Sequence, residues 1–280
     1  MAEGLGRGRA AVEPEHEMLN ATTARASAMR RKTRLITPTA GDTIRVAWTS
    51  MRLAVVSDIH GNLPALEAVL ADLEKVQPDA VVLGGDLALG GPHPVEVVDR
   101  LRQLRWPSVL GNTDEALDEQ RLPEKLRATF VGLAAARTRE MLGPERVGWL
   151  TSLPLEWQAD GVAVVHATPS DCWAIVGHDA PDEKVRDVFG AAGVPTAVYG
   201  HIHHAYVREL GGLTVANSGS VSLSLDGDPR ACYALIEDGR IEHRRVEYDI
   251  ERVASEFEAI DYPNAKIYAA WLRNGEDRSQ

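Results

Sequence analysis

Cysteine is scarce in this chain, which has only Cys172 and Cys232 among its 280 residues. Two cysteines cannot form a disulfide framework, and neither belongs to a closely spaced metal-binding pair. We expect both to be small buried residues. Long hydrophobic runs are also lacking, since no segment approaches the roughly 18 to 20 apolar residues of a membrane span. The N-terminus has no apolar core followed by a cleavage site. Together these absences predict a cytoplasmic protein that does not bind membranes.

Positive charge is in the minority, with 30 Lys and Arg against 41 Asp and Glu and a net charge of -11. This balance argues against general binding to nucleic acids, which depends on basic side chains that displace counterions. A small basic cluster lies near Arg30 and Lys32, in a stretch without apolar periodicity. We therefore predict that residues 1–50 are a disordered extension, with a basic arm touching RNA or lipid as the alternative. Residues 51–280 are predicted to form a single domain.

From Arg52 onward, short apolar runs that end in Gly, Asp, Asn or His alternate with helical stretches. The five runs are LAVVSDIHGN at 53–62, AVVLGGDLALGG at 80–91, PSVLGNTDE at 107–115, VAVVHATPS at 162–170 and TAVYGHIHHA at 196–205. Continuous apolar strands are typical of a sheet that is covered on both faces. Apolar residues at helical spacing predict a crossover helix over 63–76, with Pro64 in its first turn.

The rest of the chain has a different character. Residues 115–150 contain no strand signal and predict two or three helices, a lid or side layer inserted between the third and fourth strands. LTVAN, ACYALIE and RIEHRRVEY, which all follow His204, are separated by turn signals and indicate an antiparallel second sheet or sheet edge. From Ile250 onward the pattern favours helix packed on the outside. The class is therefore α/β.

Ligands of open α/β sheets bind beyond the carboxyl ends of the strands, where loops leave a crevice. Every candidate at these ends is a residue type that can bind a metal; the set is Asp58, His60, Asp86, Asn112, His166, His201 and His203. Taken singly, each has a structural explanation, such as a helix cap, a tight turn or a buried histidine. Five strand ends that each carry a ligand type favour a metal centre instead.

Residues two apart in an extended segment point to the same side, so Asp58 with His60 and His201 with His203 can converge. Imidazole, carboxylate and amide oxygen form a mixed donor set that suits Mn, Fe, Zn, Co or Ni better than Ca or Mg. Seven ligands are too many for one ion. They suit two divalent ions if Asp86, which follows Gly84 and Gly85, lies between them.

A charge count indicates the substrate. Two divalent ions with the Asp58 and Asp86 carboxylates and a bridging hydroxide leave a net charge of about +1, which attracts a phosphate anion although the protein is acidic. Two ions roughly 3.5 to 4 Å apart can activate a water molecule and stabilise both the attacking and the leaving oxygen of an in-line displacement. The sequence therefore predicts hydrolysis of phosphate esters.

The motifs DIHGN at 58–62, GGD at 84–86, GN at 111–112, VVHATP around His166 and GHIHH at 200–204 resemble those of the calcineurin-like metallophosphoesterase superfamily, particularly its small bacterial and archaeal phosphodiesterase-type members. The resemblance implies a four-layer αββα sandwich with two facing mixed sheets. It also implies that Asp58, His60 and His203 hold one metal, that Asn112, His166 and His201 hold the second, and that Asp86 bridges them. Asp86, Asn112 and His166 are the residues we assign to catalysis, and manganese is the ion we expect to support activity in an assay.

The sequence departs from the family pattern at Thr113. Many members have histidine there, which protonates the leaving group or contacts the phosphate, and the next acidic residue, here Asp114, orients it. A threonine hydroxyl cannot donate a proton near neutral pH as an imidazolium can. We therefore expect phosphodiesters, in the form of small phosphoesters or nucleotides, to be preferred over monoesters.

Four further residues are candidates for substrate binding: Asn62, His93, Thr113 and Asp114. For Asn62 the alternative is a hydrogen bond within the turn, and for His93 it is an ordinary position in a surface loop. Two other functions remain open. One is a phosphatase acting on monoesters of protein or nucleotide, and the other is a scaffold that binds metal without catalysis.

Overall fold

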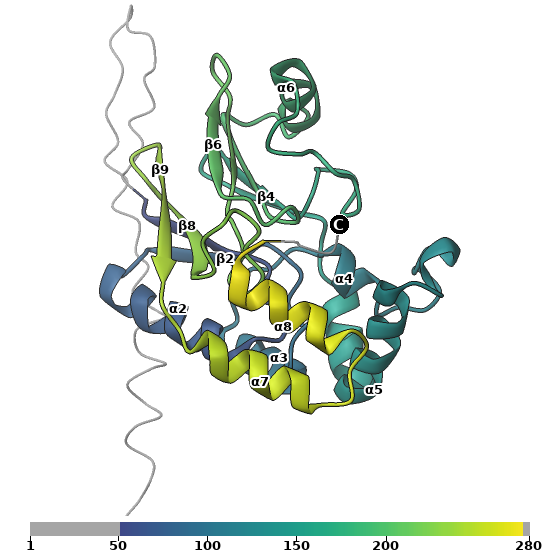
Figure 1. Ribbon diagram of the computed structural model, residues 1–280. Helices are drawn as coiled ribbons and strands as arrows, with labels where there is room; N and C mark the ends of the chain where they lie inside the picture. The colour runs from purple at the N-terminus through teal and green to yellow at the C-terminus, as the bar shows by residue number, and fades with distance from the viewer. Residues whose placement is uncertain (1–50, 277–280) are drawn as a thin grey trace, which may run out of the picture. The chain divides into compact units, whose positions relative to one another are not determined.

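The computed structural model describes residues 51–276, so the prediction for residues 1–50 lies outside the described residues. Within this range the chain forms two mixed sheets and seven α-helices, which confirms the predicted α/β class (Figure 1). The elements are β1 (Leu53–Val56), α2 (Leu63–Val76), β2 (Ala80–Leu83), α3 (Pro94–Leu104), α4 (Asn112–Glu115), a 3-10 turn η1 (Glu124–Leu126), α5 (Phe130–Thr151), β3 (Glu156–Ala159), β4 (Val162–Val165), α6 (Asp182–Gly190), β5 (Thr196–Tyr199), β6 (Tyr206–Glu209), β7 (Thr214–Asn217), β8 (Ala231–Glu237), β9 (Arg240–Val246), α7 (Ile250–Ala259) and α8 (Ala265–Asn274).

Along the chain, the strands of the second sheet all lie between two pairs of strands that belong to the first. The first sheet has the order β2-β1-β8-β9 and the second the order β3-β4-β5-β7-β6. β1 and β2 are parallel, as are β4, β5 and β7, so each sheet contains parallel strands that end at the same edge. Of the two predictions for the later strands, the sheet edge is confirmed and a separate second sheet is not, because β8 and β9 extend the first sheet antiparallel while β7 joins the second.

Three apolar clusters separate four layers. One cluster lies between the sheets and includes Val55 and Val82 from the first sheet and Val164 and Val198 from the second. Another packs helices α2, α3, α5, α7 and α8 on the outer face of the first sheet. The third packs Val185 and Phe189 of α6 on the outer face of the second. In Figure 1, α6 accordingly lies on the opposite side of the strands from α2, α3 and α7. The predicted αββα sandwich is confirmed.

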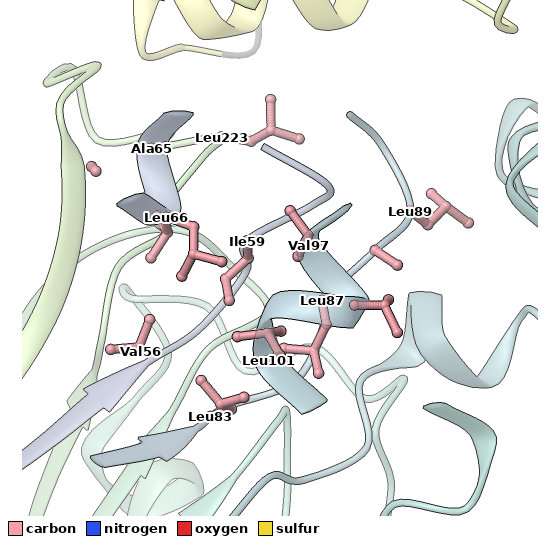
Figure 2. Packing of buried hydrophobic residues seen from close by; sticks show 14 of the residues in the cluster. Val56, Ile59, Ala65, Leu66, Leu83, Leu87, Leu89, Val97, Leu101 and Leu223 are labelled. Atoms are coloured by element: carbon pink, nitrogen blue, oxygen red, sulfur yellow. The ribbon is translucent and has the colours of Figure 1, made fainter. Parts of the chain in front are cut away.

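The predicted crossover helix is α2, whose bounds match the apolar periodicity. The Asn62 side chain accepts a hydrogen bond from the Ala65 N–H and so caps the helix, and Pro64 occupies its first turn. Its buried face packs on β1 and on α3. Figure 2 shows this core, in which Leu66 lies beside Val56 and Ile59, and Leu101 beside Leu83 and Leu87.

Two local predictions fail near the middle of the chain. The expected third strand at 107–110 is reduced to one parallel bridge, between Ser108 and Leu83, because the chain turns into α4 directly after Leu110. The strand β3, which was not predicted, forms a hairpin with β4 through Asp160 and Gly161. The helical insertion therefore lies between β2 and β3, and its main helix α5 is broken at Gly143, where φ is 70°.

Other sequence expectations hold for the described part of the chain. Cys172 and Cys232 are both buried and unpaired. Over residues 51–276, no helix combines the length and apolar character needed to cross a membrane. The C-terminal stretch forms α7 and α8, which pack side by side on the outside of the helical layer (Figure 1).

Two glycines of α5 provide a matched test of this packing. A Cβ atom at Gly132 would lie 2.4 Å from the carbonyl oxygens of Leu126 and Arg127, whereas one at Gly148 would meet nothing within 4 Å. We expect Gly132→Ala to lower the free energy of unfolding by about 1–3 kcal/mol. Gly148→Ala should raise it by about 0.5–1 kcal/mol, because alanine favours helix. Chemical denaturation of both variants measures the difference, and equal effects would contradict the close contact at Gly132.

Candidate metal centre

The candidate ligands lie in turns with unusual backbone conformations. Of the described non-glycine residues, ten have positive φ, and five of these are candidate ligands: Asp58 (58°), His60 (48°), Asp86 (54°), His201 (68°) and His203 (56°). This left-handed conformation costs an L-residue on the order of 1 kcal/mol and persists where the surrounding structure enforces it. Such positions concentrate at functional sites, and here they aim side chains from β1, β2 and β5 into one place.

Four of these side chains form a first group. One ligand atom each of Asp58, His60, Asp86 and His203 lies within 4.8 Å of all the others, and all four residues are buried. His203 Nε2 is 3.1 Å from Asp58 Oδ1, and His60 Nε2 is 3.2 Å from His203 Nε2. The structure thus brings together the three residues predicted for one metal and the aspartate predicted to lie beside them.

A second group lies next to the first. His166 Nε2 and His201 Nδ1 are each 2.9 Å from Asn112 Oδ1 and 3.2 Å from one another. Asp86 stands between the two groups, because its Oδ1 is 3.3 Å from His166 Nε2 while its Oδ2 is 3.7 Å from His60 Nε2. All seven predicted ligands therefore converge, and one carboxylate presents an oxygen atom to each group.

The far side of each imidazole ring fixes its tautomer. The Nδ1–H groups of His60, His166 and His203 donate to the backbone carbonyls of Leu89, Gly84 and Leu223, at 2.6, 2.9 and 2.7 Å. A carbonyl can only accept, so Nδ1 carries the proton and Nε2 of the neutral ring keeps a lone pair. This arrangement is typical of histidines that bind metals.

A direct consequence concerns His60 and His203. Their Nε2 atoms lie 3.2 Å apart, and Nε2 of His203 is also 3.1 Å from Asp58 Oδ1. A cation near both nitrogen atoms accommodates this approach, as does a proton on His203, which the Asp58 carboxylate favours. Together with the Asp58 carboxylate, the donor set therefore fits a divalent cation.

The pKa values of these side chains follow from burial and from one another. Burial raises the pKa of Asp58, but the neighbouring His203 outweighs this effect and holds it below its usual range. Burial lowers the pKa of His60 and, with help from His166, that of His201 to about 4. Neutral imidazole and ionised carboxylate are the forms that bind metals. Only for His203, which lies against Asp58, is the pKa raised despite burial.

Asp114, predicted to bind substrate, is instead a fully buried support for Asp86. Its Oδ2 accepts hydrogen bonds from the N–H groups of Asp86 and Gly111, at 2.8 and 3.1 Å, and its Oδ1 accepts one from Leu87 at 3.0 Å. Burial, together with the negative charge of Asp86, raises its pKa to about 7. Because every one of these contacts is to backbone, Asp114 fixes the turn that carries the central carboxylate, and its assignment to substrate binding stays a prediction.

Two other candidates for substrate binding, Asn62 and His93, also make contacts with the fold. Asn62 is fully buried, with its Oδ1 capping α2 and its Nδ2–H donating to Ser222 Oγ at 3.1 Å, so the turn alternative is correct. His93 precedes α3 and turns toward α7, where its Nε2 lies 3.2 Å from Glu256 Oε2. Both side chains are committed to packing between structural elements.

Thr113 lies inside the site but does not expose its hydroxyl group. Its backbone N–H donates to Asp86 Oδ1 at 2.9 Å. Its Oγ1 is shielded from solvent and has no hydrogen-bond partner in the part of the chain that the structure describes. The structure thus gives Thr113 a positioning contact through its backbone, whereas the predicted substrate contact would require the shielded hydroxyl to become accessible.

Sequence reasoning missed a supporting segment over 217–224, a run of small residues after β7. Ser220 Oγ donates to the Asp58 carbonyl at 2.9 Å and accepts from the Leu223 N–H, so it joins the turn of one ligand to the residue that orients His203. Asn217 Nδ2–H donates to the Gly200 carbonyl just before His201. The signal was present as four serines in NSGSVSLS, but alternating small polar residues also fit an ordinary loop.

Comparison with known proteins gives the same assignment for sequence and fold. Residues 51–239 match the family described as the calcineurin-like phosphoesterase superfamily domain. Protein MJ0912 of Methanocaldococcus jannaschii is 32% identical over 223 residues, which cover 71% of this chain and 89% of that protein. Phosphodiesterase YfcE of Escherichia coli is 25% identical over 204 residues, which cover 67% of this chain and 88% of that protein.

Solved structures are similar along most of the described chain. A metallophosphoesterase from Sphaerobacter thermophilus aligns with a TM-score of 0.67 and 28% identity, covering 81% of this chain and 99% of that one. The protein PH1004 from Pyrococcus horikoshii aligns with a TM-score of 0.70 and the same coverage, and its 18% identity supports the fold alone.

The support given by Asp114 can be tested separately from metal ligation. In Asp114→Asn an amide N–H would face backbone N–H donors, so we expect the Asp86 turn to shift and the affinity for metal to fall by about 10- to 100-fold. Asp118→Asn is the control, because Asp118 accepts only the exposed Gln120 N–H through its Oδ1. Metal titration of folded protein measures the effect, and unchanged affinity in Asp114→Asn would show that the three hydrogen bonds do not hold the ligand.

Proposed function

This chain belongs to the calcineurin-like phosphoesterase superfamily, and we propose that it is a dinuclear metal-dependent phosphoesterase that prefers phosphodiesters. The observation that carries the proposal is the buried cluster of Asp58, His60, Asp86 and His203, whose ligand atoms all lie within 4.8 Å of one another. The second group around Asn112 supports a second ion. Each group has imidazole and oxygen donors, and Asp86 offers one oxygen atom to each.

The donor chemistry limits which metals would be held. Asp58, His60 and His203 would hold one ion, Asn112, His166 and His201 the other, and Asp86 would contact both. Nitrogen and oxygen donors in this proportion favour Mn, Fe, Zn, Co or Ni over Mg or Ca, and we expect manganese to support activity in an assay. When bound, such ions polarise the phosphoryl group and lower the pKa of a coordinated water molecule.

The chain's own residues supply the arrangement rather than a proton. The backbone carbonyls behind His60, His166 and His203 accept Nδ1–H and so hold those rings with Nε2 aimed inward. Thr113 N–H and the turn held by Asp114 fix the direction of the Asp86 carboxylate. This preorganisation means that little reorganisation would accompany the reaction, which is the usual source of rate enhancement in phosphoryl transfer.

The charge environment supports diesters over monoesters. The charged groups that most affect the pKa values of Asp58, His60 and His201 are Asp and His side chains, and no lysine or arginine is among these strongest influences within the described residues. A monoester carries up to about two negative charges at neutral pH. Family members commonly have a histidine that contacts the phosphate at the position where this chain has Thr113. A diester carries one negative charge. The similarity to a protein named a phosphodiesterase agrees with this preference.

The number of ions is the first test. We expect two manganese ions per wild-type chain, about one in Asn112→Ala, and loss of both ions and of hydrolysis in Asp86→Ala. His93→Gln is the control, because it changes only the contact with Glu256 and should keep both ions. Asn217→Ala is unsuitable as a control because the Asn217 side chain supports Gly200. Elemental analysis after dialysis gives the counts. One ion per wild-type chain, or an active Asp86→Ala protein, would refute the dinuclear proposal.

Ester class is the second test. Manganese-loaded protein should hydrolyse bis-p-nitrophenyl phosphate with a higher kcat/KM than p-nitrophenyl phosphate. The two substrates share a leaving group, so their ratio reports the charge on the phosphate rather than the leaving group. A ratio that favours the monoester would identify a phosphomonoesterase. Two bound ions without hydrolysis of either ester, or of nucleotide diesters, would identify a binding scaffold.

A further inference from the structure

His201 differs from the other three histidine ligands in how its ring is held. The rings of His60, His166 and His203 are each fixed by a backbone carbonyl that accepts their Nδ1–H. His201 instead presents Nδ1 to the site, 2.9 Å from Asn112 Oδ1, and its Nε2 forms no hydrogen bond with the part of the chain that the structure describes. The position of this ring therefore depends on the backbone turn that carries it.

The turn before His201 is held by Asn217, the last residue of β7. Asn217 Nδ2–H donates to the carbonyl of Gly200, and its Oδ1 accepts the Gly219 N–H at 3.0 Å. The side-chain amide is thus fixed at both ends, and the residue is fully buried. Gly200 also donates its N–H to the His166 carbonyl at 2.9 Å, so its position affects two ligands of the second group.

Asn217 is contacted in turn by His243, which comes from the other sheet. His243 lies on β9, the edge strand of the first sheet, and its Nε2 is 2.7 Å from the Asn217 carbonyl oxygen (Figure 1). Because a carbonyl can only accept, the ring donates from Nε2. Burial lowers the pKa of His243, so the ring is neutral near pH 7 and Nε2 carries its one proton. The hydrogen bond joins the two sheets at the end of β7.

We propose that His243 is a positioning residue for the second metal group, which it holds in place through Asn217 and the turn at Gly200. This inference rests on the proposed dinuclear function. The first group has other supports, namely the carbonyls behind His60 and His203, so loss of His243 should act on one ion rather than on both. Sequence reasoning missed His243, because it lies beyond residue 239, where the family match ends, in a strand that indicated only a sheet edge.

The test is the variant His243→Phe in the full chain, titrated with manganese. Phenylalanine keeps an aromatic ring but has no N–H to donate. We expect the affinity for the second ion to fall roughly 10- to 100-fold, as for loss of a group that supports a metal ligand, and the affinity for the first to stay close to wild type. Calorimetry measures both affinities, and electron paramagnetic resonance separates paired from isolated manganese ions.

Rescue by a conservative variant separates the hydrogen bond from the bulk of the ring. His243→Gln keeps an N–H donor at about the distance of Nε2 from the backbone, so it should restore the affinity for the second ion. A loss in His243→Gln equal to that in His243→Phe would show that the hydrogen bond to Asn217 is not the cause, and would overturn the proposal.

A neighbour on the same strand serves as the matched control. Ile241 lies two residues before His243, packs in the apolar cluster between the sheets and has no side-chain donor. Ile241→Ala should therefore lower thermal stability while both metal affinities stay unchanged. If Ile241→Ala weakened the second ion as much as His243→Phe does, general loosening of the sheets would explain both effects and the proposal would fail.

A double variant tests the route through Asn217. Asn217→Ala removes the hydrogen bond to the Gly200 carbonyl and should weaken the second ion by itself. Adding His243→Phe to it should have little further effect on that ion, because the contact through which His243 acts is already lost. Additive effects of the two substitutions on the affinity for the second ion would overturn this route.

The outcomes distinguish this inference from the function on which it rests. Two ions in the wild-type protein and an unchanged second affinity in His243→Phe would overturn the role of His243 alone. An equal loss of both ions would overturn its assignment to the second group. A single ion per wild-type chain would overturn the dinuclear proposal and this inference with it.

Discussion

The close approach of several buried imidazole and carboxylate groups is the constraint on which this structure depends. Nε2 of His60 and Nε2 of His203 lie 3.2 Å apart, and His166 Nε2 lies equally close to His201 Nδ1 beside Asn112. Other interactions hold these buried polar side chains in place. The backbone carbonyls that accept the Nδ1–H groups do this for three rings, and Asp114 does it for the turn of Asp86.

The same constraint explains the glycines around the site. The two sheets meet closely at Ser57, where a Cβ atom at Gly84 or Gly200 would lie 2.6 or 2.2 Å from its Oγ. A Cβ atom at Gly111 would lie 2.1 Å from Asp86 Oδ1. Ligands from β1, β2 and β5 can therefore converge only because the backbone carries no side chains at these points. Close packing of the sheets and convergence of the ligands are one structural requirement.

The sequence revealed the ligands because they follow a simple physical rule, in which polar residues end buried parallel strands and the strand ends share one edge. It was less informative where the deciding contact joins distant segments. Asn62, His93 and Asp114 are polar residues beside ligands, and only the structure shows that Ser222, Glu256 and a set of backbone N–H groups occupy them. The division of the later strands between two sheets likewise depends on long-range pairing. The alternation of apolar and polar residues within one segment does not reveal such pairing.

The short helix α4 connects ligation with the part of the molecule expected to contact substrate. It begins at Asn112 and ends at Glu115, whose Oε2 accepts the Trp173 indole N–H at 2.6 Å and lies 3.6 Å from Cys172 Sγ. The loop after His166 is thereby attached to the same four residues that supply a ligand and the support of Asp86. Glu115 also pairs with Arg121, which donates to the carbonyl of Thr151 at the end of α5. The loop after His166 and the end of α5 are therefore both attached to the short helix that supplies Asn112.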